Sequence, residues 1–412
     1  MTTFRKLAGA LALSASVAVL GLAPAVTAQA KPAAHAAAES YLVYIGTYTG
    51  PNSKGIYAYR FKPATGALTS LGLIQEAVNP TWLGQHPNHR FLYSVNEHPT
   101  KTEPGNSITA YARDLKTGKL NLLNTVSSTG EGPAHLDIDK TGKIVAVANF
   151  ITGSVATFLI KPDGSLSEAV SSIRQEGKAA GPAMAKDDRG LSPTDSHNHQ
   201  VKFSPDNRFL LVCNTGMGRV FVFKVNHTTG EIAPHGAYDF PGRSRHLAFS
   251  PNGKYVYIMG GANPVTTAAY DAKTGALKMV QSIENAPLAT NPPKTLMAGS
   301  EVAVDPAGKF VYTSSRATNE SLQSASLDGA INVFAVNAGT GKLTPVQTVN
   351  SGGDGPRSFV LDPTGRYLWV GNRGSSNFVV FKRNLTTGKL TPTGNARTDA
   401  GGVSAFVFEA EQ

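Results

Sequence analysis

A short sequence motif recurs seven times along the chain, and this repetition constrains the fold more than any other feature. Each copy is a turn centred on a glycine and followed by the first apolar residue of a new strand, and successive glycines are 45 to 66 residues apart. The seven glycines are Gly66, Gly118, Gly164, Gly230, Gly275, Gly341 and Gly388. A period in this range is typical of solenoids and propellers, in which one small unit of strands or helices is repeated.

The copy at residues 355–390 shows the unit most clearly. An apolar run stops at the turn 362–365 (DPTG), where proline presets φ and glycine permits a positive φ, so the chain reverses. Runs rich in β-branched and aromatic residues follow, and a second turn precedes Leu390. The four predicted strands are 358–361, 367–370, 377–382 and a run that begins at Leu390. The unit is therefore a four-stranded antiparallel meander.

The two ends of the chain complete one unit between them. Residues 41–46 (YLVYIG) have the sequence of a second strand, and residues 402–408 (GVSAFVF) have that of a first strand. We therefore predict an all-β protein, a seven-bladed β-propeller of four-stranded antiparallel blades, whose ring is closed by N- and C-terminal strands that share a blade. This domain is predicted at residues 41–412.

The N-terminus has the features of an export signal. A basic pair at 5–6 precedes an apolar run at 7–22, and AQA at 28–30 fits the small-x-small rule for signal cleavage. A stable membrane anchor would need about 20 apolar residues and no cleavage site. We expect a signal peptide at residues 1–30, cleaved after Ala30, and a disordered lead-in at 31–40. The mature protein is expected to be secreted or periplasmic.

Composition and charge exclude several partners. Lysines are scattered over turns without aromatic residues between them, so no nucleic-acid groove is expected. The net charge of +10 becomes +8, with 36 basic and 28 acidic residues, once Arg5 and Lys6 leave with the signal. This balance fits a small anionic molecule or an acidic surface as partner. The single Cys213 is predicted to be buried. The histidines lack the spacing of a closed zinc site, and we expect a monomer without metal or cofactor.

The repeat places its long insertions at one face. In an antiparallel meander, the start of strand one, the end of strand two and the connection to the next blade lie at the same end. The four long insertions all fall at that end, at 97–106, 174–196, 284–299 and 316–328. Loops on a rigid scaffold commonly carry binding or catalytic residues. The site is therefore expected at this elaborated face.

Polar side chains gather at the same end of the first strands. Aligning the copies on the first turn brings two adjacent positions together at the mouth, and the next position inward is always apolar. These two positions hold Trp82, His135, Gln200, His246, Glu301 and Ser358, and, one residue earlier, Thr81, Ala134, His199, Arg245, Ser300 and Arg357. Second strands end in Asn96, Asn149, Asn214 and Asn372, and Arg316 lies just beyond the matching position. If first strands line the axis, these residues surround one mouth of the channel.

Simple structural roles compete with a functional one. An asparagine that closes a second strand is favoured as a turn residue bonded to the local backbone. A single histidine at a blade rim serves equally well as a structural hydrogen-bond partner. Arg245, Arg316 and Arg357 at one mouth are harder to explain structurally, because guanidinium groups repel one another and need an anion. One acid, Glu301, does not balance all three.

Several motifs resemble a known family. They are the opening YIGTYT, the His-x-His at 197–199, RHLAFSPNGKYVY, EVAVDPAGKFVYTSSR and GPRSFVLDPTGRYLWVGNRG. Over residues 41–408 the chain resembles the lactonase family of seven-bladed propellers, which includes propeller-type 6-phosphogluconolactonases and a fungal carboxymuconate cycloisomerase. The resemblance implies that the family's polar cluster maps onto His135, His199, Arg245, Glu301, Arg316 and Arg357. Phe150 stands where the family commonly has tyrosine, and Ser315 where it often has asparagine.

The resemblance implies the opening of a small, anionic, sugar-acid type of lactone by water. A base takes the proton of the attacking water and a cation stabilises the oxyanion. The candidate catalytic residues are Glu301 or His199 as base, His135 as acid or orienting group, and Arg316, with Arg245, as the clamp on the oxyanion and the substrate anion. Arg245, Arg357, Asn149 and His197 are candidates for substrate binding. Two alternatives stay open: a muconate-type cycloisomerase that forms a lactone, and a secreted propeller that binds an acidic ligand or surface without reaction.

The signal-peptide interpretation predicts that the mature chain starts at Lys31, outside the cytoplasm, because signal peptidase cuts after the small residue that ends AQA. N-terminal sequencing of protein from the culture medium or periplasm checks this. Replacing Ala28 and Ala30 with bulky residues is the matched control and should leave the precursor uncleaved. An intact Met1 on most wild-type molecules would contradict the prediction.

Overall fold

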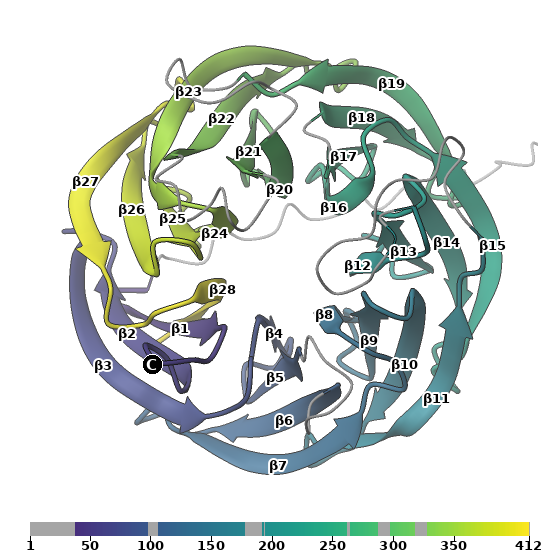
Figure 1. Cartoon of the computed structure of the whole chain (residues 1–412), viewed down its shortest axis with the longest axis horizontal. Helices are drawn as coiled ribbons and strands as arrows, with labels where there is room; N and C mark the ends of the chain where they lie inside the picture. The colour runs from purple at the N-terminus through teal and green to yellow at the C-terminus, as the bar shows by residue number, and fades with distance from the viewer. Residues whose placement is uncertain are drawn as a thin grey trace, which may run out of the picture. The chain divides into compact units, whose positions relative to one another are not determined.

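Seven four-stranded antiparallel sheets are arranged around a central axis, as Figure 1 shows. They belong to a computed structural model that describes residues 38–97, 106–177, 192, 194–261, 264–286, 297–317 and 328–411. Strands account for all regular secondary structure in these ranges, and the predicted seven-bladed propeller is confirmed. The predicted signal peptide, most of the lead-in and the middle parts of the four long insertions lie outside the described residues.

In six blades the strands follow one another outward from the axis in chain order. The inner strands are β4 (Trp82–Gln85), β8 (Pro133–Ile138), β12 (Asn198–Phe203), β16 (Ser244–Phe249), β20 (Met297–Val304) and β24 (Pro356–Leu361). The second strands are β5 (Phe91–Asn96), β9 (Ile144–Asn149), β13 (Phe209–Asn214), β17 (Tyr255–Gly260), β21 (Phe310–Ala317) and β25 (Tyr367–Asn372). Inner strands of neighbouring blades contact one another around the axis.

The outer half of each blade is less buried. The third strands are β6 (Ser107–Arg113), β10 (Ser154–Ile160), β14 (Arg219–Val225), β18 (Pro264–Tyr270), β22 (Asp328–Val336) and β26 (Asn377–Arg383). The outermost strands are β7 (Leu120–Ser127), β11 (Leu166–Arg174), β15 (Ile232–Asp239), β19 (Leu277–Glu284), β23 (Leu343–Asp354) and β27 (Leu390–Arg397). Second strands are buried on both faces, whereas outermost strands alternate toward solvent. The core therefore lies between blades.

The seventh blade is built from both ends of the chain, as predicted. Its order from the axis is β28 (Val403–Ala410), β1 (Tyr41–Thr47), β2 (Gly55–Lys62) and β3 (Ala67–Glu76). β28 and β1 pair antiparallel, with Tyr41 opposite Ala410 and Val43 opposite Phe408. The C-terminal strand thus fills the inner position that the N-terminal segment lacks.

Local chemistry explains why the repeated turn sequence reverses the chain. Between β24 and β25, Oδ1 of Asp362 accepts a hydrogen bond from the backbone N–H of Tyr367 at 2.7 Å. Its Oδ2 accepts one from the backbone N–H of Thr364 at 3.1 Å. Gly365 has a φ of 65°, in the left-handed region that glycine enters without steric cost. The aspartate and the glycine therefore fix the turn together.

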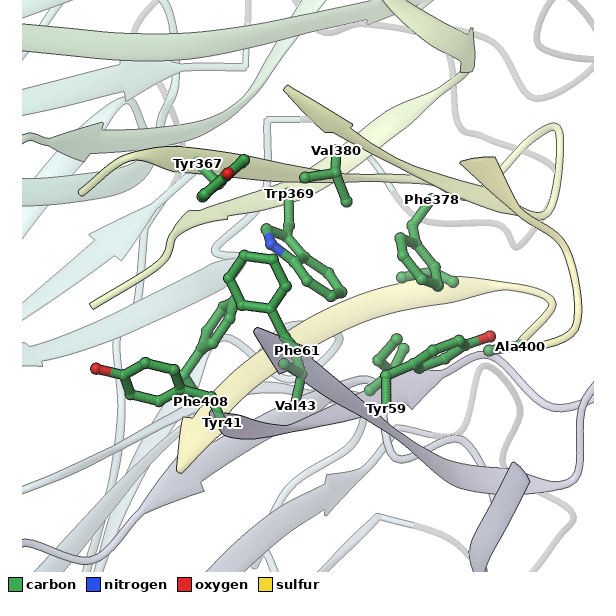
Figure 2. Packing of buried hydrophobic residues seen from close by; sticks show 12 residues of the cluster. Tyr41, Val43, Tyr59, Phe61, Tyr367, Trp369, Phe378, Val380, Ala400 and Phe408 are labelled. Atoms are coloured by element: carbon green, nitrogen blue, oxygen red, sulfur yellow. The ribbon is translucent and has the colours of Figure 1, made fainter. Parts of the chain in front are cut away.

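Aromatic packing joins the shared blade to the blade before it. Figure 2 shows Phe61 and Phe408 facing Trp369, across the seam between the two blades. The rings of Phe61 and Trp369 are 5.2 Å apart and nearly perpendicular, while Phe378 stacks on Trp369 at 5.2 Å. Such edge and stacked pairs add to the free energy gained by burial. This seam is where the last blade meets the first.

Two further features concern a buried thiol and the type of secondary structure. Cys213 in β13 is fully buried, and burial raises the pKa of its thiol, as expected for an inert buried cysteine. None of the described residues belong to a helix with the length and apolar character needed to cross a membrane.

Deleting residues 402–412 is expected to destabilise the ring strongly, because it leaves β1 as an open edge. The deletion also removes the buried side chains of Val403, Val407 and Phe408. Each large apolar side chain contributes roughly 1.5–3 kcal/mol, so the loss should be about 5 kcal/mol or more. Thermal and urea unfolding measure it, with removal of Gln412 alone as the control. A truncated protein that melts at the parent temperature would contradict ring closure by β28.

Candidate active site

The inner strands of all seven blades enclose a central cavity of about 460 Å³. At the end of the cavity nearest the start of the inner strands, one layer of side chains lines the wall: Trp82, His135, Gln200, Glu301 and Ser358. We call this layer the cavity tier. Three polar atoms of this tier are buried without a hydrogen-bond partner among the described residues: Nδ1 of His135, Oε2 of Glu301 and Oγ of Ser358. Buried polar atoms are normally satisfied, so these three suit a polar molecule in the cavity.

Next to this tier, toward the start of the inner strands, lie several of the predicted residues. His199 on β12, Arg245 on β16 and Arg357 on β24 are each one residue closer to the mouth than the cavity tier. Arg316 lies near the end of β21, which continues to Ala317. The guanidinium groups of Arg357 and Arg316 are both near enough to Arg245 to lower its pKa. The fold therefore brings residues from separate blades into one charged cluster.

Glu301, His246 and His199 form a continuous hydrogen-bonded chain across three blades. Nδ1 of His246 lies 2.8 Å from Oε1 of Glu301, and Nε2 of His246 lies 3.0 Å from Nδ1 of His199. All three side chains are buried. Among the described residues, no group of three or more histidine, cysteine, aspartate or glutamate side chains is arranged to hold a metal ion.

His135 approaches this chain from another side. Its ring lies 4.1 Å from that of Trp82 in a tilted stack and 5.6 Å from that of His246, edge to face. Trp82 also contacts His246 edge to face, at 5.6 Å. Aromatic packing therefore holds His135 beside the cavity with Nδ1 unpartnered among the described residues.

Arg245 is buried beside other cations. Burial lowers its pKa well below the ordinary value, and the charges of Arg357 and Arg316 lower it further, whereas the carboxyl of Glu301 acts in the opposite direction. One of its terminal nitrogens donates a hydrogen bond to the backbone carbonyl of Ser300, a neutral acceptor. A bound anion would relieve both the burial and the repulsion.

Arg357 has partners that the sequence did not reveal. Its Nη2 lies 3.5 Å from Oε2 of Glu97, and its Nε donates to Oγ of Ser404 at 3.2 Å. Its guanidinium also lies 5.0 Å from the ring centre of Tyr48, whose hydroxyl donates to Oε2 of Glu97 at 2.8 Å. Burial raises the pKa of Tyr48 to about 12, so the phenol keeps its proton. Glu97 is thus a second acid at this mouth, beside Glu301.

Burial also shifts the titration of the acid and of the histidines. It raises the pKa of Glu301 to about 8, although Arg245 and the backbone N–H of Val302 oppose the shift. Burial, with the positive charges around them, holds the pKa values of His135, His199 and His246 well below 6.5. All three imidazoles are therefore neutral at pH 7.

Asn149 and His197 make local structural bonds. The amide nitrogen of Asn149 donates to the carbonyl of Ser128 at 3.0 Å and to Oγ of Ser154 at 3.1 Å. The ring nitrogens of His197 lie 2.9 and 2.8 Å from the carbonyl oxygens of Phe150 and Ser192. His197 also stacks on Phe150, and Phe150 contacts His199 edge to face. The bonds of the amide nitrogen fit the structural role that the sequence favours for such an asparagine, whereas Oδ1 of Asn149 is buried without a hydrogen-bond partner among the described residues.

Four residues of this mouth were not predicted from the sequence as catalytic or binding residues: His246, Glu97, Trp82 and Tyr48. His246 occupies the same repeat position as His135, and that shared position was the available signal. Glu97 follows the asparagine that ends β5, and nothing in its local sequence indicates a partner on β24. These contacts cross between blades, where the repeat register gives no direct information.

The raised pKa of Glu301 predicts a pH-dependent stability. Between pH 5 and 8 the unfolded chain has an ionised Glu301 while the folded chain keeps its proton, so stability falls as pH rises through this window. Glu301→Gln lacks this titration, so wild type should lose stability relative to the variant, by up to about 1.4 kcal/mol per pH unit. Urea unfolding at pH 5, 6.5 and 8 measures the difference. Glu231→Gln, at an exposed turn, is the control, and a pH-independent difference between wild type and Glu301→Gln would contradict the prediction.

Comparison with known proteins agrees with this geometry. Residues 42–408 match the family described as Lactonase, 7-bladed beta-propeller. The 6-phosphogluconolactonase of Bacillus subtilis is 31% identical over 348 residues, which cover 83% of this chain and 91% of that protein. The 6-phosphogluconolactonase of Formosa agariphila is 30% identical over 349 residues, covering 83% and 92%.

A solved structure extends the similarity to the whole propeller. The periplasmic gluconolactonase of Pseudomonas aeruginosa superimposes with a TM-score of 0.77 at 26% identity, over 90% of this chain and 100% of that one. The named relatives are lactone-hydrolysing enzymes, and the prediction of a lactonase-like enzyme is confirmed at this level. The chain belongs to the lactonase family of seven-bladed β-propellers.

Proposed function

We propose that this protein hydrolyses a small anionic lactone of the sugar-acid type, and that water attacks the lactone at the mouth of the central channel. The observation that carries the proposal is the buried Arg245, with Arg316 and Arg357 close by, next to the neutral histidines and Glu301. The lactonase family supports the reaction class, and the relatives named 6-phosphogluconolactonase and gluconolactonase support a sugar-acid lactone.

The reaction needs a proton acceptor, an oxyanion stabiliser and a way to hold the substrate. Glu301 and His199 are the two groups that can accept the proton of the attacking water. Arg245, with Arg316, stabilises the oxyanion that forms on the lactone carbonyl and binds the anionic group of the substrate. Arg357, held by Glu97 and Tyr48, contributes the remaining positive charge.

His135 and the other residues of the cavity tier accommodate the rest of the lactone ring. Nδ1 of His135, Oε2 of Glu301 and Oγ of Ser358 lack partners among the described residues and match the hydroxyl groups of a sugar acid. Trp82 offers an aromatic face beside them. His135, which is neutral at pH 7, donates or accepts a hydrogen bond without adding another positive charge to the cluster.

Export is part of the proposal. The basic and apolar N-terminal sequence with its AQA site supports it, and the Pseudomonas aeruginosa relative is described as periplasmic. This placement favours a carboxylate-bearing lactone over a sugar phosphate lactone confined to the cytosol.

Turnover of the purified mature protein on a panel of sugar, sugar-phosphate and aromatic lactones tests the reaction. The expected result is consumption of a sugar-type lactone, measured as release of acid. Formation of a lactone from a diacid would support the cycloisomerase alternative instead. Ligand binding without turnover of any lactone would support the binding-only alternative and overturn the proposed hydrolysis.

Arg245→Ala and Arg357→Ala are expected to weaken binding of an anionic substrate or product by about 2 kcal/mol or more, roughly 30-fold in KM or Ki, because a buried charged hydrogen-bond donor is lost. Steady-state kinetics and inhibition by the hydroxy-acid product measure the change. Arg219→Ala, at an outer ion pair with Asp239, is the matched control. Unchanged affinity in both arginine variants would place the anion site elsewhere.

A further inference from the structure

A backbone contact fixes the direction of the hydrogen bonds in the chain Glu301–His246–His199. The backbone N–H of Val302 donates to Oε1 of Glu301 at 3.0 Å, so this oxygen acts as an acceptor. Nδ1 of His246 lies 2.8 Å from the same oxygen and is best assigned the hydrogen between them. Before the reaction, a carboxyl proton, when present, belongs on Oε2, which has no partner among the described residues. The assignment therefore holds for both ionisation states of Glu301.

The remaining protons follow from the chemistry of a neutral imidazole. His246 is neutral, because burial and nearby guanidinium groups lower its pKa, so its Nε2 carries a lone pair once Nδ1 holds the hydrogen. Nδ1 of His199, 3.0 Å away, is then the donor. His199 is neutral as well, which leaves the lone pair on its own Nε2. That nitrogen makes no recorded hydrogen bond within the described part of the chain.

We infer that His246 is a positioning residue, which connects Glu301 to His199 and holds Nε2 of His199 ready as the base for the attacking water. The inference rests on the proposed lactone hydrolysis, and it selects His199 over Glu301 as the group that contacts the water. A carboxylate that orients an imidazole base is the logic of catalytic triads. Here a second imidazole stands between the carboxylate and the base.

The proton transfers balance over one turnover. The water oxygen bonds to the lactone carbonyl carbon, the carbonyl electron pair moves to oxygen, and the water proton passes to Nε2 of His199. The proton on Nδ1 of His199 moves to Nε2 of His246, and the one on Nδ1 of His246 moves to Oε1 of Glu301. When the intermediate collapses, the ring C–O bond breaks. The chain then runs in reverse, and Nε2 of His199 returns a proton to the departing ring oxygen, which becomes the product hydroxyl.

The groups around the hydrogen-bonded chain favour proton transfer to Glu301 over the formation of a positively charged histidine. The charged and titratable groups that act on its members are Arg245, Arg316, Arg357, Lys202 and His135. The positive charges of the arginines and of Lys202 oppose an imidazolium at either ring, and His135 is itself neutral. Moving the proton through to Glu301 neutralises a carboxylate instead and leaves both rings uncharged. The transfer requires an ionised Glu301, so the rate should rise with pH through the pKa of this carboxyl, near 8.

The first test reads the tautomer directly and needs no substrate. Wild-type protein carrying ¹⁵N- and ¹³C-labelled histidine is studied by NMR, and the spectrum of His199→Gln identifies the signals of His199. The expected result is a neutral His199 with hydrogen on Nδ1 and none on Nε2. A His199 that carries hydrogen on Nε2, or on both nitrogens at pH 7, would overturn the inference, whether or not the protein hydrolyses lactones.

The second test separates a positioning role from a merely structural one. His246→Gln is expected to lower kcat by about 100-fold or more with KM changed less than about threefold, and to release His199 from the Nδ1–H form. His86→Gln is the matched control, because His86 is a buried histidine whose Nε2 contacts the carbonyl of Gly142 on the turn side. A His246→Gln enzyme with the kcat of the control would overturn the inference.

Glu301→Gln provides a third readout that does not depend on the folding of the His246 variant. Its side-chain oxygen still accepts from Val302 and His246, so His199 should keep its tautomer while kcat falls and the rise of rate with pH near 8 disappears. Retention of that rise in Glu301→Gln would overturn the relay to Glu301. If wild type hydrolyses no lactone, the proposed function fails, and the NMR result still decides the proton assignment.

Discussion

Antiparallel pairing of β28 with β1 is the interaction on which the rest of the structure depends. A propeller blade hides its edges only when its neighbours and its own strands are complete. The shared blade supplies that completion, because β28 takes the inner position and Phe408 packs against the seam around Trp369. Without it, β1 would present an open edge and the seven inner strands would no longer enclose the channel.

Closure of the ring brings the positive charges at the mouth of the channel together. Residues that are far apart in sequence, such as Arg245 and Arg357, are held next to each other and away from water. The cost of burying like charges together is offset partly by Glu97, a carbonyl and the ring of Tyr48. Burial, together with the residual positive field, keeps the histidines neutral, and the field favours an anionic ligand. Strongly shifted pKa values of this kind are typical of functional sites.

The neutral imidazoles determine the direction in which a proton can move along the hydrogen-bonded chain. In water, a histidine at pH 7 exchanges its proton freely between both nitrogens and solvent. At this mouth, hydrogen bonds join the backbone N–H of Val302 to Glu301, Glu301 to His246, and His246 to His199. Each of these hydrogen bonds therefore constrains the proton position in the next. Such a chain passes a proton over several ångströms without charging a ring. It therefore suits a pocket already lined with guanidinium groups.

The sequence by itself determined the repeat, the positions of most strands and the elaborated face. Turn residues such as Asp362 and Gly365 act through local bonds and a local φ value, so their effect can be read from neighbouring residues. The family also follows from motifs that are continuous in sequence. Even the tier that holds His135 and Glu301 could be predicted, since the register of the inner strands repeats from blade to blade.

Only the tertiary structure decided which side chains of that tier meet. The link through His246, the pairing of Glu97 with Arg357 and the packing of Trp82 on His135 all cross between blades. They depend on side-chain directions and on the angle between neighbouring sheets, which the repeat does not encode locally. Asn149 and His197 shared the sequence features of site residues, but the amide nitrogen of Asn149 and both ring nitrogens of His197 contact backbone carbonyls. His197 also reaches across blades, to the carbonyl of Phe150, so the two groups differ in whether their polar atoms contact backbone carbonyls or side chains of the cluster, and residue type does not reveal this.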